Sequence, residues 1–223
     1  MRFFALFFLI GSVFSAQVLD KYIDIDIREG DVVFWDIDHT LIEPLTYEGS
    51  EPWFQSLYGA AMTINEEAKS YVIQLYNHFQ FKTEVRLTEP SLKDFWPAWK
   101  RKGVLMFGLT SRSTTLADRT HTQLQSVGLD FDKTTHQYCA QPILVDNILF
   151  TAGGHKGKVL KDFLKENPDL SKKRIIFVDD SIKNIQAVES ELSQLDFDVE
   201  IYHYEQSAHR YHKISQLHHS HHH

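Results

Sequence analysis

Residues 32–41 of the chain read Val32-Val33-Phe34-Trp35-Asp36-Ile37-Asp38-His39-Thr40-Leu41. A run of four apolar residues is typical of a buried strand in a parallel sheet. The run ends in two carboxylates one residue apart, at the edge where open α/β sheets bind their ligands. Two carboxylates this close repel each other unless a cation or a shared proton lies between them. The stretch therefore predicts a divalent-metal site or a nucleophile paired with an acid/base, although a helix cap after the strand would have the same sequence.

The composition sets the class of protein. The 223 residues include 23 basic and 30 acidic side chains, with a formal net charge of −7, so nothing points to a nucleic-acid partner. The length and a hydrophobic content of 43% suit one globular domain with an insertion. The single cysteine, Cys139, cannot form an intramolecular disulfide, and we interpret it as a small buried apolar residue.

Both ends of the chain differ from its body. Residues 1–16 start with a positive charge, continue with an apolar stretch and finish in Ser15 and Ala16, which is typical of a secretory signal peptide. We therefore expect an exported protein, periplasmic or secreted, with no permanent membrane span; an uncleaved N-terminal anchor is the alternative. Residues 218–223 are almost all histidine and form a separate tail, either a purification tag, a natural tail or a weak metal-binding end.

A long segment interrupts the α/β pattern. Residues 44–103 exceed an ordinary crossover between strands, so we predict a helical cap insertion there. Helical spacing occurs over 66–79 and 91–101, with Thr63 and Ser91 as caps. The aromatic residues of this segment are predicted to form its own core: Trp53, Phe54, Phe95, Trp96 and Trp99.

The remaining residues, 17–43 and 104–217, are predicted to form the α/β core, a mainly parallel sheet flanked by helices. Residues 17–30 fit a leading helix or an edge strand. Asp146-Asn147 between two apolar runs, 142–145 and 148–151, indicates a hairpin. The other expected elements are strands over 104–109, 175–178 and 199–203, and helices over 116–127, 156–164 and 182–192.

Four element ends of this core carry polar groups. They are Asp36 and Asp38, then Thr110, then Lys156, then Asp179-Asp180. In a parallel sheet such ends converge on one crevice. Carboxylate pairs suit Mg²⁺, which prefers oxygen ligands, while a hydroxyl and an ammonium group can hold the oxygens of a transferring phosphoryl group.

With these four motifs in this order, the chain resembles the haloacid dehalogenase-like (HAD) phosphatases. The motifs are Asp36-Ile37-Asp38-His39-Thr40, Leu109-Thr110, Lys156-Gly157 and Val178-Asp179-Asp180. More closely, Gly108-Leu109-Thr110-Ser111-Arg112 and Gly153-Gly154-His155-Lys156-Gly157 are similar to a secreted HAD branch known as a domain-of-unknown-function family. The resemblance implies a Rossmann-like core with a cap between the first and second motifs.

The resemblance also implies roles. Asp36 would be the nucleophile that forms an aspartyl-phosphate, and Asp38 the acid/base. Mg²⁺ would be held by Asp36, the Asp38 carbonyl oxygen and Asp180. Thr110 and Lys156 would bind phosphate oxygens, and Ser111 could reach the substrate.

Several assignments stay open at this stage. Asp180 is preferred over Asp179 as the metal ligand, with Asp179 contacting the ligands from behind and Asn184 orienting the acidic loop. Lys156 is preferred over Lys158 as the phosphate-binding lysine. Arg112 fits either a contact to a second anionic group or a surface position, and His39 fits a structural contact better than proton transfer.

The predicted function is a Mg²⁺-dependent phosphomonoester hydrolase acting on a phosphorylated small molecule or other phosphoester. The alternative is a catalytically inactive HAD-like protein that binds a phosphorylated ligand or partner. A phosphomutase remains open, since it uses the same apparatus. A dehalogenase is disfavoured because it would not need Asp38, and a receiver domain is excluded because its acidic pair comes first.

Overall fold

A central sheet organises the computed structural model, which describes residues 15–138 and 143–207. Within these residues the sheet has seven strands in the order β1-β9-β8-β2-β5-β7-β6, and only the β6–β7 pair is antiparallel. The strands are β1 (Gln17–Leu19), β2 (Val32–Trp35), β5 (Leu105–Thr110), β6 (Leu144–Val145), β7 (Ile148–Phe150), β8 (Ile175–Asp179) and β9 (Val199–Tyr204). The α/β class with a mainly parallel sheet is confirmed, and β1 is the edge strand expected near residue 17.

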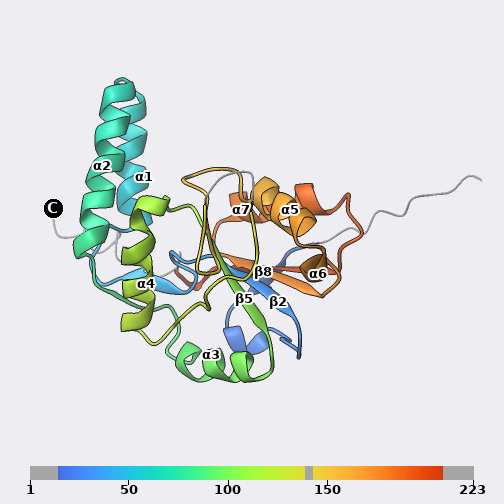
Figure 1. Cartoon of the computed structure of the whole chain (residues 1–223). Coiled ribbons are helices and arrows are strands. Elements are labelled where there is room, and N and C mark those ends of the chain that lie inside the picture. The colour runs from blue at the N-terminus through green and yellow to red at the C-terminus, as the bar shows by residue number, and fades with distance from the viewer. Residues whose placement is uncertain (1–14, 139–142, 208–223) are drawn as a thin grey trace, which may run out of the picture.

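Helices cover both faces of this sheet, as Figure 1 shows. One face carries α3 (Leu92–Arg101) and α4 (Ala117–Ser126), which a short 3₁₀ turn (Thr114–Leu116) precedes. The other face carries α5 (Lys156–Glu166), α6 (Pro168–Ser171) and α7 (Ile182–Leu192). A second 3₁₀ turn, Tyr22–Asp24, follows β1.

Strand β2 is central because both of its faces are apolar. Val33 and Trp35 point into the core under α3 and α4, whereas Val32 and Phe34 point into the core under α5 and α7. All four side chains are fully buried, which explains the continuous apolar run in place of an alternating one. Since β5 and β8 pair with β2 on either side, the residues that follow these three strands meet at one edge.

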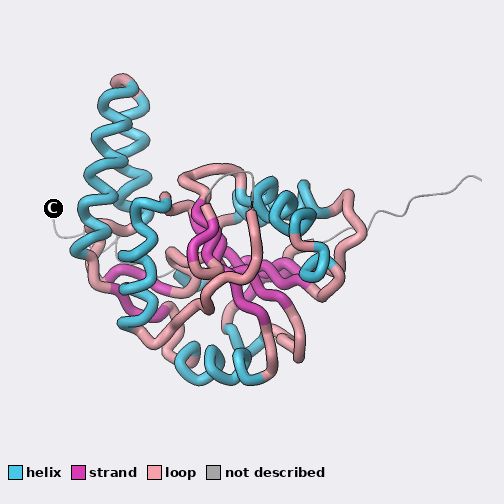
Figure 2. The backbone as a smooth tube through the Cα atoms, viewed as in Figure 1, coloured by secondary structure: helices cyan, strands magenta, loops and turns pink. Residues whose placement is uncertain are grey.

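A helical hairpin leaves this body between β2 and β5. It consists of α1 (Glu51–Met62) and α2 (Glu66–Lys82), which stand on a small antiparallel ribbon of β3 (Ile42–Pro44) and β4 (Val85–Leu87). Figure 2 shows the two helices projecting away from the sheet. The ribbon pairs Glu43 with Arg86, so the two ends of the hairpin are held together at its base.

The sequence analysis missed α1 and misplaced one of its two predicted caps. The N-cap of α1 is Ser50, whose side chain accepts a hydrogen bond from the Trp53 amide. The N-cap of α2 is Asn65, so the prediction of Thr63 is wrong: Thr63 ends α1 instead. Ser91 is the N-cap of α3, as predicted, although its side chain makes no capping hydrogen bond.

The prediction that the aromatic residues of the insertion form a core of their own is wrong for the three that belong to α3. Trp53 and Phe54 do pack within the hairpin, against Phe79 and Tyr76. Trp96 and Trp99 instead pack on Trp35 of β2, with ring centroids 6.1 and 5.4 Å apart, and Phe95 stacks on Trp99. Helix α3 is thus a crossover helix that covers the sheet, because its tryptophans bury more apolar surface there than the thin hairpin offers.

Some predictions fall on residues outside the described ranges. These are the body of the signal peptide (1–14), Cys139, the first residue of the expected hairpin strand (Pro142) and the histidine-rich tail. The described part of that hairpin is confirmed: β6 and β7 flank Asp146 and Asn147, whose φ angles are 46° and 57°.

Gly157 allows α5 and α7 to pack closely. A Cβ atom at this position would lie 2.1 Å from the Ala187 carbonyl oxygen, so a side chain must push the helices apart. We expect Gly157→Ala to lower the free energy of unfolding by about 2–3 kcal/mol in urea titrations. The same change would disturb the first turn of α5, where Lys156 lies.

Gly59 is the matched control for this substitution. It lies inside α1, and no atom lies within 4 Å of the place that a Cβ atom would take, so Gly59→Ala should raise stability by about 0.5–1 kcal/mol. Equal unfolding free energies for the two variants would contradict the packing argument.

Candidate functional site

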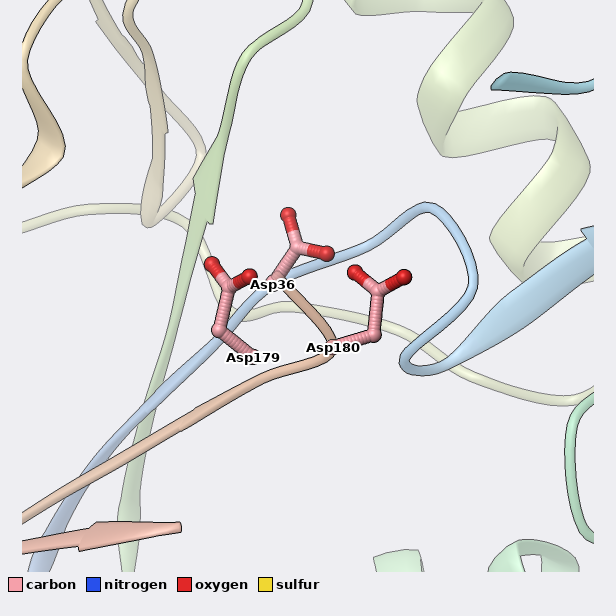
Figure 3. A group of neighbouring side chains, drawn as sticks. All are labelled: Asp36, Asp179 and Asp180. Atoms are coloured by element: carbon pink, nitrogen blue, oxygen red, sulfur yellow. The ribbon is translucent and has the colours of Figure 1, made fainter. Parts of the chain in front are cut away.

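Three aspartates gather where β2 and β8 end. Asp36 follows β2, Asp179 ends β8 and Asp180 follows it, and their carboxylate oxygens lie within 4.8 Å of one another. Figure 3 shows the three carboxylates pointing to the same side of the strand ends. The Asp36 amide also donates to the Val178 carbonyl oxygen, 2.9 Å away, which holds the two strand ends together.

Lys156 brings a positive charge into this group. Its Nζ atom lies 2.5 Å from Asp36 Oδ1 and 2.7 Å from Asp179 Oδ2, and the side chain is 1% exposed. It is the first residue of α5, whose N-cap His155 accepts a hydrogen bond from the Lys158 amide. Lys158 itself is exposed. The structure thus places Lys156, and not Lys158, among the carboxylates.

The two members of the acidic pair have different surroundings. Asp179 is fully buried, and it accepts hydrogen bonds from the Ser181 amide and from Asn184 Nδ2. Asp180 is only partly buried and keeps its carboxylate beside Asp36. This arrangement agrees with Asn184 orienting the loop, and it leaves oxygens of both aspartates within the acidic group.

Burial raises the pKa of Asp36 to about 8, against the opposing charge of Lys156. Burial and the neighbouring carboxylates of Asp36 and Asp179 also raise the pKa of Asp180 well above its ordinary value. Three carboxyl groups, those of Asp36, Asp179 and Asp180, therefore share the single positive charge of Lys156 and repel one another when ionised. A cation bound among them would relieve this repulsion.

The hydroxyls of the predicted motifs lie around the same strand ends. Thr40 Oγ1 donates to Asp36 Oδ2 at 3.0 Å and so fixes the carboxylate. Thr110 is fully buried at the end of β5, where its Oγ1 accepts from the Arg112 amide at 3.2 Å. Ser111 is exposed. Thr110 and Ser111 therefore both lie at the sheet edge, but only Thr110 is enclosed.

The structure corrects the interpretation of Arg112. This residue is not at the surface, and its guanidinium group is already paired with a carboxylate of the chain itself. Its guanidinium group forms a bidentate ion pair with Asp38, with Nε–Oδ2 and Nη2–Oδ1 distances of 2.8 and 2.7 Å. The arginine is 5% exposed. Although burial opposes ionisation of Asp38, the charge and hydrogen bonds of Arg112 hold the pKa of Asp38 below its usual value.

His39 makes structural contacts, as the sequence analysis preferred. It adopts a left-handed conformation with φ of 61°, and it is buried. Its Nε2 accepts from the Glu51 amide at 3.2 Å, so Nδ1 carries the proton and donates to Ser207 Oγ at 2.9 Å. Ser207 in turn donates to Glu43 Oε2. His39 thus joins the motif loop to the start of α1 and to the end of the described chain.

The sequence analysis missed three residues that the hairpin contributes. Burial, then the charge of Asp38, raises the pKa of both Glu51 and Tyr76, so both side chains are close enough to Asp38 to interact with its charge. Gln80 is 2% exposed and lies 3.4 Å from Arg112 Nη2 through its Oε1. The four-residue spacing of Tyr76 and Gln80 on α2 was the available signal, but nothing in the sequence says which body that helix face contacts.

The donor set fits a magnesium ion. Carboxylate oxygens of Asp36, Asp179 and Asp180 are close enough to share one cation, and oxygen is the ligand atom that Mg²⁺ prefers. Lys156 already neutralises part of the group, so the site also suits an anion bound beside the metal.

Comparison with known proteins gives a family. Residues 15–220 match the family model described as "Protein of unknown function (DUF2608)". This match confirms the expected relation to a domain-of-unknown-function family.

Two curated relatives come from Chlamydia. A protein of Chlamydia muridarum named "Putative outer membrane protein" is 25% identical over 205 residues, which cover 84% of this chain and 78% of the relative. A protein of Chlamydia trachomatis with the same name is 27% identical over 172 residues, which cover 72% of this chain and 64% of that protein. Across the described ranges of our chain, no helix has the length and apolar character needed to cross a bilayer.

Solved structures give distant likenesses. A Thermotoga maritima protein named "putative beta-phosphoglucomutase" superposes with a TM-score of 0.46 at 14% identity, covering 78% of this chain and 84% of that one. A haloacid dehalogenase-like family hydrolase from Streptococcus pneumoniae gives 0.45 at 13% identity, covering 81% and 97%. At these scores the likenesses add nothing to an argument on function.

Proposed function

We propose that this chain, which belongs to the DUF2608 family, is a Mg²⁺-dependent phosphomonoester hydrolase that works through an aspartyl-phosphate on Asp36. One observation carries the proposal: the buried Lys156 ammonium lies between Asp36 and Asp179, within a group of three carboxylates at the strand ends. Such a group can hold a metal and a phosphoryl oxygen together, and phosphoryl transfer depends mostly on positioning and charge neutralisation.

The residues divide the reaction between them. An Asp36 oxygen attacks phosphorus while the bond from phosphorus to the leaving oxygen breaks. Thr110, Ser111 and Lys156 bind the phosphoryl oxygens. Mg²⁺ would be held by Asp36, the Asp38 carbonyl oxygen and Asp180, and it would supply charge neutralisation for the nucleophile and the phosphate. Water then attacks the aspartyl-phosphate and regenerates Asp36.

Asp38 handles the protons of both steps. Because Arg112 keeps Asp38 ionised in the free site, Asp38 must gain a proton before it can protonate the leaving oxygen. A phosphomonoester, with a second pKa of about 6, brings such a proton in its monoanionic form. In the second step the carboxylate takes a proton from the attacking water.

We propose that the α1–α2 hairpin takes part in selecting the substrate. Glu51 belongs to α1 and Tyr76 to α2, and the charge of Asp38 contributes to the raised pKa of both side chains. We therefore infer that these two side chains lie close to a substrate bound at the phosphoryl site. We place specificity for a phosphorylated small molecule or other phosphoester in this part of the insertion.

We also propose that the protein is exported. The expected signal peptide in residues 1–16, together with relatives whose names refer to the outer membrane, supports a periplasmic or secreted enzyme.

Metal removal tests the function directly. Protein without residues 1–16 should hydrolyse an aryl phosphate with added Mg²⁺, and EDTA should lower the rate at least about 10²-fold, with recovery when excess Mg²⁺ returns. If the aryl ester is not hydrolysed, a panel of sugar, nucleoside and alkyl phosphates follows. Binding of inorganic phosphate without turnover of any ester would favour the inactive, ligand-binding alternative.

Mg²⁺ binding should depend on pH. The metal would displace a proton from Asp36, whose pKa burial raises to about 8, and it would also compete with protons for Asp180, whose pKa is raised as well. Affinity should therefore increase at least about tenfold per pH unit between about pH 6 and pH 8. Titration calorimetry measures this slope, and a flat profile would contradict it.

The metal-free protein should show the matching stability trend. A carboxyl group with a raised folded-state pKa stabilises the fold while it is protonated, and this contribution is lost as pH rises through about 8. The melting temperature of the metal-free protein should therefore decrease over this range, and Mg²⁺ should restore it.

A further inference from the structure

Arg112 makes more contacts than an ion pair with Asp38 requires. Its Nη1 atom donates to Thr120 Oγ1 at 2.9 Å and to Gln123 Oε1 at 2.6 Å, both on α4. Its Nη2 atom, besides bonding to Asp38, lies 3.4 Å from Gln80 Oε1 on α2. The guanidinium group is thus fixed by Asp38, by two side chains of α4 and by Gln80 of α2. The bidentate pair in turn fixes the orientation of the Asp38 carboxylate.

The same residues secure the base of the hairpin. Gln80 Nε2 donates to the Gly49 carbonyl oxygen at 2.6 Å, just before α1 starts. Gln123 Nε2 donates to the Thr83 carbonyl oxygen at 2.9 Å, just after α2 ends. Arg112 therefore lies where the hairpin, α4 and the first motif meet, although its sequence position alone puts it after β5.

A second arginine shares only one of these functions. Arg119 donates from Nε to the Gln80 carbonyl oxygen at 3.0 Å and from Nη2 to the Thr83 carbonyl oxygen at 2.8 Å. Both of these hydrogen bonds go to the hairpin base. A substitution of Arg119 should therefore weaken the attachment of the hairpin without changing the orientation of Asp38.

We propose that Arg112 is the positioning residue for Asp38 and that it couples the orientation of this carboxylate to the base of the α1–α2 hairpin. The inference rests on the proposed function. A bidentate, fully enclosed guanidinium fixes both oxygens of a carboxylate, which a single-point ammonium contact cannot do. Placement of the hairpin base would thereby decide whether Asp38 is aimed at the attacking water.

Arg112→Lys tests the positioning role because lysine keeps the positive charge but cannot form the bidentate pair with both oxygens of Asp38. We expect kcat for an aryl phosphate with a good leaving group to fall about 10²-fold. Since the water step needs Asp38 most, the variant should release a burst of about one phenol per enzyme and accumulate the Asp36 phosphoenzyme, detected by intact-protein mass after acid quench. A loss of folded protein would lower the rate without such accumulation.

The double variant shows whether Arg112 acts through Asp38. If it does, Arg112→Lys combined with Asp38→Asn should be no slower than Asp38→Asn alone. A further loss of more than about tenfold would mean that Arg112 contacts the substrate itself, and this would overturn the proposal.

Arg119→Lys is the matched control. We expect amide hydrogen exchange over residues 79–83 to accelerate at least about fivefold in both arginine variants, because both loosen the hairpin base. Only Arg112→Lys should accumulate phosphoenzyme. Unchanged exchange in Arg112→Lys would overturn the coupling, and a wild-type burst pattern in that variant would overturn the positioning role while leaving the hydrolase intact. Absence of any turnover by the wild type would remove the proposed function together with this inference.

Discussion

Asp36→Asn is expected to lower kcat for phosphoester hydrolysis at least about 10⁴-fold, because the amide cannot form the aspartyl-phosphate. The wild-type carboxylate is held in position by Thr40 and Lys156, so the nucleophile needs no search for its orientation. Steady-state hydrolysis of an aryl phosphate measures the loss. Intact-protein mass after acid quench should show the phosphoenzyme only in the protein that retains Asp36.

The stability of this variant separates chemistry from folding. Burial raises the pKa of Asp36 to about 8, so the fold favours the protonated carboxyl group and loses its contribution as the pH rises through that value. Asparagine has no charge to bury and can still accept from Lys156. At about pH 8.5 and without metal, Asp36→Asn should therefore melt no lower than the wild type. Residual turnover within tenfold of wild type would rule out Asp36 as the nucleophile.

Lys156→Met should affect both activity and stability. The change leaves Asp36 and Asp179 buried without their shared cation, and removal of one partner of a buried ion pair costs about 3–5 kcal/mol. Protonation of Asp36, whose pKa burial raises to about 8, offsets part of this cost at low pH. Urea titrations should therefore show a larger loss at about pH 8 than at about pH 5. The value of kcat/KM should fall at least about 10³-fold, since the charge proposed to bind the phosphate is lost as well.

Lys158→Met is the control within the same helix turn. Lys158 is exposed and has the same side chain, so its replacement should change the unfolding free energy by no more than about 0.5 kcal/mol. Activity should stay near wild type. Equal effects of the two substitutions would contradict the placement of Lys156 among the carboxylates.

Local sequence was sufficient for the central part of the site. An apolar strand buried on both faces has a distinctive composition, and the polar residues that follow such strands meet at one edge of a parallel sheet. Asp36, Thr110, Lys156 and Asp179 could therefore be grouped in advance. Asn184 could also be assigned to the acidic loop, because it lies in the first turn of α7, which directly follows that loop.

Predictions on the insertion were weaker, because a helical pattern does not identify its contact surface. The aromatic residues of α3 have the same spacing whether they form a core of their own or cover β2, and only the fold shows Trp96 and Trp99 against Trp35. Helix α1 was missed although Trp53, Phe54, Leu57, Tyr58 and Ala61 carry a helical spacing.

The sequence by itself determined the α/β class, the family's motifs and the edge of the sheet where the carboxylates lie, since these depend on short patterns that one strand and its following turn contain. Only the tertiary structure decided the partners of Arg112. The pair with Asp38 joins residues 74 positions apart, and the contact with Gln80 depends on how the hairpin docks against α4. Such a contact exists only after separate elements pack, because no local periodicity records which charged side chain a buried guanidinium will meet.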